Sequence, residues 1–121
     1  MRQTGIFAVA LIGMLAIAAP AFAEYGAFAL DSTTGKYGFS WNERDQHAAD
    51  AAALKGCKSD SCKVVFQVGP KHCGAIATTE NGKIWGGADR DERDAAKLAA
   101  LENCQKRTKE QCVIRGNECN R

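Results

Sequence analysis

The side chains in this sequence that could do chemistry are six cysteines and two histidines. Cysteine thiols bind metals, act as nucleophiles or join as disulfides, whereas imidazoles serve as acid–base groups or metal ligands. No two cysteines have the Cys-x-x-Cys spacing of redox and zinc motifs. An even number in a short chain with an export signal predicts three disulfides in an oxidising compartment. The cysteines are Cys57, Cys62, Cys73, Cys104, Cys112 and Cys119.

A zinc site is the main alternative to disulfides for these cysteines. Cys57-x4-Cys62, together with His72 and Cys73, supplies potential ligands. The close cysteine pair of a zinc motif is missing, however, and an exported chain is unfavourable for free thiolates. We therefore expect no metal and no cofactor.

His47 is the histidine with acid–base neighbours, because Glu43 precedes it by four residues and Asp50 follows it by three. On a helix these side chains would share one face. Such a face is typical of an acid–base or metal cluster, or simply of a solvated helix start. The sequence contains no Gly-x-Ser-x-Gly elbow, His-Glu-x-x-His motif or phosphate-binding glycine loop. We assign no catalytic residue.

Aromatic residues are the best candidates for a binding surface. Tyr37, Phe39 and Trp41 alternate along one predicted strand and share a face, and Trp85 lies in the corresponding strand of the second half. These rings either fill the core or form a partly exposed platform for a glycan or a partner protein. We name Tyr37, Trp41 and Trp85 as candidate binding residues. The basic loop 106–109 is either a contact for an acidic partner or an ordinary solvated loop.

The N-terminus has the pattern of a secretory signal. A positive start at Arg2 precedes an apolar stretch from Ile6 to Ala19, and Ala21-Phe22-Ala23 is a small-x-small cleavage site. We predict a cleaved signal peptide at residues 1–23 and a single exported domain, periplasmic or secreted, at 24–121. No later apolar stretch is long enough for a membrane span.

The charge of this domain is nearly balanced. The full chain has 16 Lys and Arg, of which Arg2 leaves with the signal, against 14 Asp and Glu. A dedicated nucleic-acid binder usually has a strongly basic face, so we expect no nucleic-acid partner.

An internal duplication must position these residues. The alanine-rich segment 48–57 recurs at 95–104, so that Cys57 corresponds to Cys104. The segment 25–29 recurs at 73–77. We predict an α+β fold with the order ββαβ-ββαβ, repeats at about 24–72 and 73–121, and a mainly antiparallel sheet of about six strands carrying two helices. The apolar strand 63–68 is predicted to be central.

Local signals predict the ends of these elements. Asn42 is the expected cap of the first helix, and Asp89-x-x-Glu92 is a capping box before the second. Asn81-Gly82 predicts a type I′ hairpin turn. A short last strand is expected at Val113-Ile114.

The duplication also favours one disulfide pattern among the fifteen that six cysteines allow. Equivalent cysteines should form equivalent bonds, which predicts Cys57–Cys62 and Cys104–Cys112. Cys73 and Cys119 then remain, and we expect their bond to close the two halves on each other.

The sequence resembles domain-of-unknown-function family 4189, a family of small exported bacterial domains. The resemblance is carried by segments 25–29, 37–41, 62–65 and 73–77 and by the alanine-rich helix that ends in Cys57. It implies export, disulfides and a compact α+β domain. It implies no enzyme class and no catalytic residue.

Our leading functional hypothesis is an exported, non-catalytic, disulfide-stapled domain that binds another macromolecule, a protein or a glycan, as an inhibitor or effector. One alternative is a small cell-wall hydrolase that uses His47 and nearby carboxylates. Another is a structural envelope protein without a discrete ligand.

Overall fold

The computed structural model describes residues 23–121, so residues 1–22 of the predicted signal peptide lie outside the described residues. The first half forms β1 (Tyr25–Leu30), β2 (Tyr37–Glu43), α1 (Gln46–Cys57) and β3 (Lys63–Val68). The second half forms β4 (Cys73–Thr79), β5 (Trp85–Arg90), α2 (Arg93–Gln105) and β6 (Cys112–Cys119). The predicted α+β class and the repeated ββαβ pattern are confirmed. Within residues 23–121, no helix is long and apolar enough to cross a membrane.

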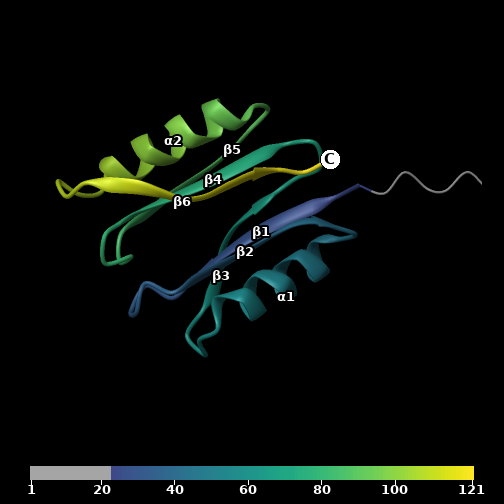
Figure 1. The fold of residues 1–121 in the computed structure, drawn as a ribbon, viewed down its shortest axis with the longest axis horizontal. Helices are drawn as coiled ribbons and strands as arrows, with labels where there is room; N and C mark the ends of the chain where they lie inside the picture. Colours follow the sequence, from purple (N-terminus) through teal and green to yellow (C-terminus); the bar gives the residue numbers. More distant parts are fainter. Residues whose placement is uncertain (1–22) are drawn as a thin grey trace, which may run out of the picture.

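The six strands are divided between two antiparallel three-stranded sheets, ordered β2-β1-β3 and β5-β4-β6, instead of forming a single sheet. Figure 1 shows four layers: α1, the first sheet, the second sheet and α2. Each repeat builds its own helix-covered sheet, and the repeats meet sheet to sheet. β3 was predicted to be central but lies at a sheet edge. Its apolar side chains are explained by contacts with α1 on one face and with the second sheet on the other.

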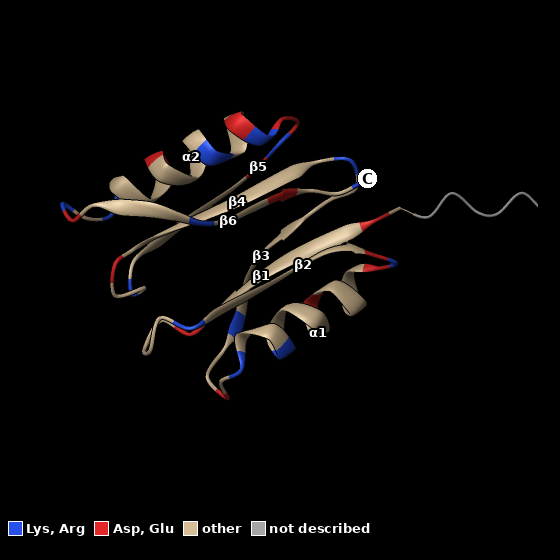
Figure 2. Ribbon diagram, in the orientation of Figure 1, with Lys and Arg blue, Asp and Glu red and all other residues tan. Residues whose placement is uncertain are grey.

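Small residues bring each helix close to its sheet. A cluster of fully buried alanines joins β1 to α1, and a similar cluster joins β4 to α2. A β-carbon at Gly38 of β2 or Gly86 of β5 would overlap the backbone of the covering helix. Charged residues lie on the helices, the loops and the flanking strands, whereas the central strands β1 and β4 carry none (Figure 2). The helices therefore approach through alanine and glycine, which contribute little apolar area of their own.

The layer between the two sheets supplies the larger apolar side chains. Phe28, Val68 and Ile76 form its fully buried centre. Phe28 stacks on Phe66 with a centroid distance of 4.7 Å and packs edge-on against Trp41 at 5.2 Å. This layer contributes most of the hydrophobic stabilisation that the alanine-faced helices lack.

Rings of the first repeat face glycines of the second across this layer. A β-carbon at Gly87 of β5 would overlap the ring of Phe66, and one at Gly116 of β6 would lie 3.2 Å from the ring of Phe39. In the first sheet Phe39 and Phe66 flank Phe28, and in the second sheet the two glycines flank Ile76 at the equivalent positions. One repeat therefore supplies the rings and the other supplies the space for them.

Three disulfides are present in residues 23–121, as predicted, and they leave no free cysteine there. Cys57–Cys62 and Cys104–Cys112 each join a helix end to the next strand. The third bond, Cys73–Cys119, joins paired residues of β4 and β6. It therefore stabilises the second sheet and does not connect the two halves, which corrects the expected role of this bond.

The residue after this disulfide connects the halves by hydrogen bonds instead. The side-chain Nδ2 of Asn120 donates to the backbone carbonyls of Val68 and Gly69 at 3.1 and 2.9 Å. Its side-chain oxygen accepts from the backbone N–H of Asn42 at 2.9 Å. Asn42 was predicted to cap the first helix, but it is the last-but-one residue of β2, where its φ is +58°. Asp45 caps α1 by accepting from the backbone N–H of Ala48 at 2.7 Å.

Three other local predictions are corrected. Glu92 is the residue immediately before α2, and its side chain forms no capping hydrogen bond within residues 23–121. Asp89 does not take part in a capping box, because it belongs to β5 and has partners elsewhere. In the 81–82 turn only Gly82 has positive φ, so the turn is not type I′; the Asn81 side chain accepts from Lys83 instead. The last strand extends from Cys112 to Cys119, because pairing with β4 continues through its polar end.

Candidate binding groove

The structure places the three predicted binding aromatics at separate positions. Tyr37 and Phe39 lie on edge strand β2, with 39% and 41% of their surface exposed, and their rings are parallel at 6.4 Å. Trp41 is half-buried against Phe28, and its buried indole N–H has no hydrogen-bond partner in the part of the chain that the structure describes. Trp85 lies on β5, an edge strand of the other sheet. The predicted residues therefore do not form one continuous platform.

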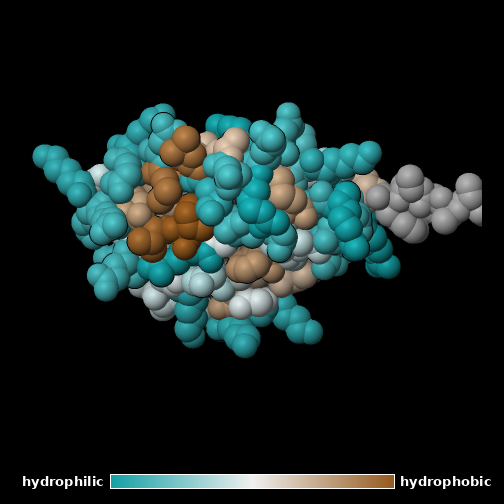
Figure 3. All heavy atoms as spheres, turned by 45° about the horizontal axis from the view of Figure 1, so that its top comes forward, coloured by the Kyte–Doolittle hydropathy of each residue, from teal (hydrophilic) through white to brown (hydrophobic). Residues whose placement is uncertain are grey.

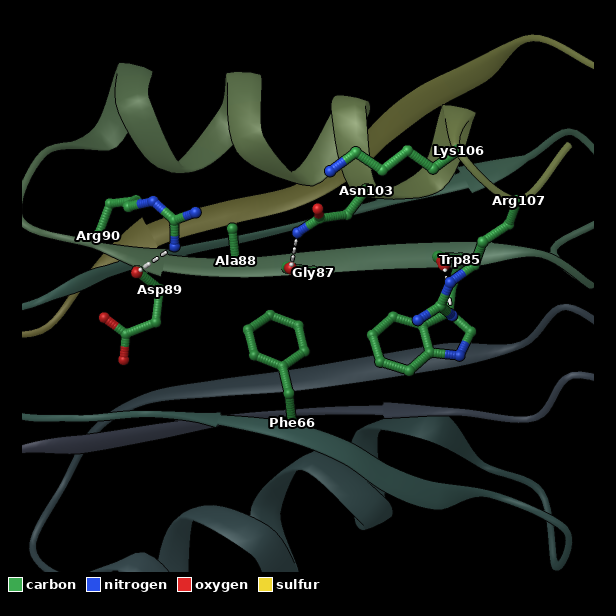
Figure 4. A pocket seen from close by; sticks show the side chains of 9 residues that line it. All are labelled: Phe66, Trp85, Gly87, Ala88, Asp89, Arg90, Asn103, Lys106 and Arg107. Carbon is green, nitrogen blue, oxygen red and sulfur yellow. Dashed lines mark hydrogen bonds between the residues drawn. The ribbon is translucent and has the colours of Figure 1, made fainter. Parts of the chain in front are cut away.

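Trp85 forms its own aromatic pair with Phe66 of β3. The two rings are nearly parallel, at 5°, and their centroids are 6.1 Å apart. Both side chains are half-buried, and they lie side by side between the sheets (Figure 4). Gly87 is what allows this arrangement, because a side chain there would displace the Phe66 ring.

These two rings lie at a hollow of about 420 Å³ that we call the Trp85 groove. It lies along the β3–β5 side of the sandwich, below the C-terminal end of α2 (Figure 4). Its lining residues are Phe66, Trp85, Gly87, Ala88, Asp89, Arg90, Asn103, Lys106 and Arg107.

The chain direction explains why basic residues reach the groove. α2 crosses close over Gly86 and ends at Gln105, so Lys106 and Arg107 emerge beside the aromatic pair. The guanidinium of Arg107 lies 5.1 Å from the Trp85 ring centroid, and its Nη1 donates to the Trp85 carbonyl oxygen at 3.0 Å. Two contacts thus hold one cation at a fixed place over the indole.

The groove carries more positive than negative charge that is free to meet a ligand. Within residues 23–121, no carboxylate lies within 4 Å of Arg90, Lys106 or Arg107 in an ion pair. Asp89 is the acidic residue of the lining, and its oxygens accept from the Gly69 N–H at 3.2 Å and contact His72. The carboxylate of Asp89 is therefore already partnered on the side of the β3–β4 turn.

His47 has the solvated surroundings that the sequence allowed as one of two interpretations, whereas the surroundings of His72 differ from the prediction. His47 is exposed on α1, and the Asp50 carboxylate accepts from the amides of Gln46 and Gln67 and not from His47. His72, predicted as an ordinary loop residue, lies between two carboxylates: Nδ1 is 2.5 Å from Asp89 and Nε2 is 3.5 Å from Asp91. Sequence reasoning missed this cluster because its members are far apart in the chain.

Asp31 is a buried carboxylate with an evident structural role. Its oxygens accept from the hydroxyl of Ser59 at 2.6 Å, the backbone N–H of Thr33 at 2.9 Å and the hydroxyl of Thr34 at 2.9 Å. These hydrogen bonds, first that of Ser59, lower the pKa of Asp31 to about 2. The carboxylate connects the β1–β2 turn to the loop after α1.

Other surface features carry less chemistry. Viewed from the α2 side, the surface is mainly hydrophilic and has one hydrophobic area (Figure 3). On this side of the fold, Leu98 of α2 is 61% exposed and Val113 of β6 is 37% exposed. Within residues 23–121, no group of three or more His, Cys, Asp or Glu side chains is arranged so that it could hold a metal ion.

The fold defines the class of protein: a small α+β domain that consists of two ββαβ units and is cross-linked by three disulfides. The chain belongs to the family described as Domain of unknown function (DUF4189), whose model matches residues 25–119. The resemblance seen in the sequence is thereby confirmed. Neither the curated proteins nor the solved structures contain a significant match to the chain.

Proposed function

We propose that this protein is an exported, non-catalytic binding domain that recognises another macromolecule through the Trp85 groove. The observation that carries the proposal is the half-exposed Phe66–Trp85 pair beside three basic side chains, which have no acidic partner among residues 23–121. Aromatic and arginine side chains contribute most to recognition surfaces. The three disulfides support a working place outside the cytoplasm, because such bonds persist in oxidising compartments.

The fold suits binding because the groove rests on rigid parts. Both aromatic residues lie on strands, and the packing of Phe28 and the contacts of Arg107 restrict their rings. A preorganised surface loses less conformational entropy on binding than a mobile loop does.

Affinity capture with a matched pair of variants tests this proposal. Lys106→Gln/Arg107→Gln removes two charges from the groove, whereas Lys36→Gln/Lys55→Gln removes two exposed charges elsewhere. We expect a macromolecule that is retained by the oxidised protein and by the control variant but released by the groove variant. Equal retention by both variants would move the binding surface away from the groove, and retention of nothing would contradict the proposal.

For the alternative function, a hydrolase, His72 is a better candidate for the general base than His47. Asp89 contacts Nδ1 of His72, which is the geometry by which a carboxylate orients a general base. Turnover of peptidoglycan that is lost in His72→Gln and kept in His47→Gln would favour a hydrolase. Unchanged turnover in both variants would remove the histidines from the function, and absence of turnover in the native protein would leave the binding proposal alone.

A further inference from the structure

We infer that the ligand of the Trp85 groove is an acidic polysaccharide, that is, a chain of sugar rings bearing carboxylate or sulfate groups. This inference rests on the proposed function and adds the chemical class of the ligand. It follows from the flat aromatic surface, the unpaired cations around it and the hydrogen-bonding groups between them.

The aromatic surface suits the apolar face of a sugar ring. One face of Phe66 stacks on Phe28 at 4.7 Å and is used inside the core. The ring also lines the groove and lies side by side with Trp85 at 6.1 Å, nearly parallel to it (Figure 4). Two rings placed in this way form an elongated, flat apolar strip, and the Arg107 guanidinium lies over one face of its Trp85 end. Sugar rings stack on such strips through their C–H groups, whereas a peptide anchor side chain fits better into a closed apolar pocket.

The cations suit an anionic substituent on the sugar. Arg107 uses Nη1 and its planar face in contacts with Trp85, and no hydrogen bond to its other two guanidinium nitrogens exists within residues 23–121. Those nitrogens form a fork that matches the two oxygens of a carboxylate or sulfate. Lys106 adjoins Arg107, and Arg90 lies at the opposite end of the groove (Figure 4). Positive charge at both ends matches a polymer with repeated acidic groups better than a ligand with one.

Asn103 supplies the polar group between the charges. Its Nδ2 donates to the carbonyl oxygen of Gly87 at 2.9 Å, which fixes the orientation of the amide. The Asn103 side-chain oxygen has no hydrogen-bond partner within the described residues, and Asn103 lines the groove (Figure 4). A sugar hydroxyl is a suitable donor for this oxygen. A nucleic acid is less suitable, because the chain as a whole carries a formal net charge of only +2 and no more than three of its basic residues line this groove.

Titration of the purified oxidised protein with defined polymers tests the inference. The set comprises polygalacturonate for carboxylate, heparin for sulfate, dextran as a neutral polysaccharide, polyglutamate as an acidic peptide and oligothymidine as a nucleic acid. We expect polygalacturonate or heparin to bind at least about tenfold more tightly than the other three polymers. Dextran lacks the anionic groups that form charge-assisted hydrogen bonds, polyglutamate lacks sugar rings, and a nucleic acid usually needs a more basic surface than this nearly neutral chain offers. Comparison of the two acidic polysaccharides identifies the anionic group.

Three variants assign the interaction to the groove. Lys106→Gln/Arg107→Gln should weaken binding about tenfold or more, and Lys36→Gln/Lys55→Gln should change it by less than about twofold. Phe66→Leu keeps apolar volume but removes the flat ring, so it should weaken binding to the polysaccharide while leaving the disulfide-bonded fold intact by circular dichroism. An unchanged affinity in Phe66→Leu would contradict stacking on this ring.

The outcomes separate the inference from the proposed function. Preference for polyglutamate or oligothymidine, lost in the groove variant, would overturn the polysaccharide and keep the groove as a binding site. Equal binding of dextran would overturn the role of charge. Absence of binding to every polymer would overturn the inference, and the capture experiment with the same variants would then decide whether the groove binds anything.

Discussion

The buried carboxylate of Asp31 makes the stability of this fold depend on pH. The residue is 1% exposed and accepts hydrogen bonds from three neighbouring residues. Those bonds favour the charged carboxylate in the folded state, whose pKa is about 2 instead of the ordinary 3.8. The folded state is therefore stabilised above the ordinary pKa, and this contribution is lost as the pH falls towards 2.

The loss of this stabilisation at low pH gives the first prediction. Asp31→Asn should make the decrease of the melting temperature between about pH 4 and pH 2 shallower, because the variant has no carboxylate to protonate. Thermal unfolding followed by circular dichroism measures the decrease. Asp60→Asn, which changes an exposed carboxylate in the next loop, is the control and should keep the native slope. Parallel slopes in native protein and Asp31→Asn would contradict the assignment.

Residue types along the strands predicted some features of the groove but not its assembly. The alternation of Tyr37, Phe39 and Trp41 correctly placed the three rings on one face, and loop 106–109 was recognised as basic. Phe66 was not assigned to a binding surface, and Arg107 was not connected with Trp85, because both approach Trp85 only through the packing of the two sheets and the end of α2. Such tertiary contacts have no signature in a single sequence.

At the scale of elements, the crossing of α1 over β2 gives the second prediction. A β-carbon at Gly38 would overlap the backbone of α1, whereas one at Gly56 would lie 3.7 Å from the Gly38 Cα, the nearest atom outside its own helix among the described residues. Gly38→Ala should destabilise by about 1–3 kcal/mol, because the helix must move away from the sheet. Gly56→Ala, within the helix, should stabilise by about 0.5–1 kcal/mol. Urea unfolding measures both, and a Gly38→Ala variant as stable as the native protein would contradict the close crossing.

The contact between the sheets gives the third prediction. Gly87→Ala should destabilise by about 1–3 kcal/mol, because its methyl group meets the Phe66 ring. Phe66→Ala should cost about 3 kcal/mol or more through lost burial. In the double variant the smaller residue at 66 makes room for the methyl group, so the total loss should be smaller than the sum. Additive losses in a double-mutant cycle would show that the two positions do not compete for the same space.

At the scale of the whole molecule, the disulfides differ in the chain length that they constrain. Cys73–Cys119 closes a separation of 46 residues, against 5 for Cys57–Cys62. On the loop-entropy model the long bond stabilises by about 4 kcal/mol and the short bond by about 2 kcal/mol. Both figures are large beside a usual domain stability of about 5–15 kcal/mol.

The fourth prediction compares these two bonds directly. Cys73→Ala/Cys119→Ala should lose about twice the unfolding free energy lost by Cys57→Ala/Cys62→Ala. Chemical denaturation of the two variants under oxidising conditions provides the comparison. A larger loss from the short bond would indicate that the link between α1 and β3 contributes through native packing and not through the unfolded chain.

The sequence predicted the repeated ββαβ order because the duplicated helix and strand segments are still recognisable. It did not predict two sheets, since six antiparallel strands with alternating residues are compatible with one sheet or two. The position of β3 shows the reason. An apolar run such as 63–68 indicates burial on both faces but does not say which neighbours provide it.

The ring-to-glycine pairing also determines which halves can combine. Two copies of the first repeat in this geometry would place Phe39 against Phe66, and the two aromatic rings would collide. Two copies of the second repeat would place Gly87 opposite Gly116 and leave a void. The duplicated segments have thus become non-interchangeable halves, and separately produced fragments should assemble only as a mixed pair.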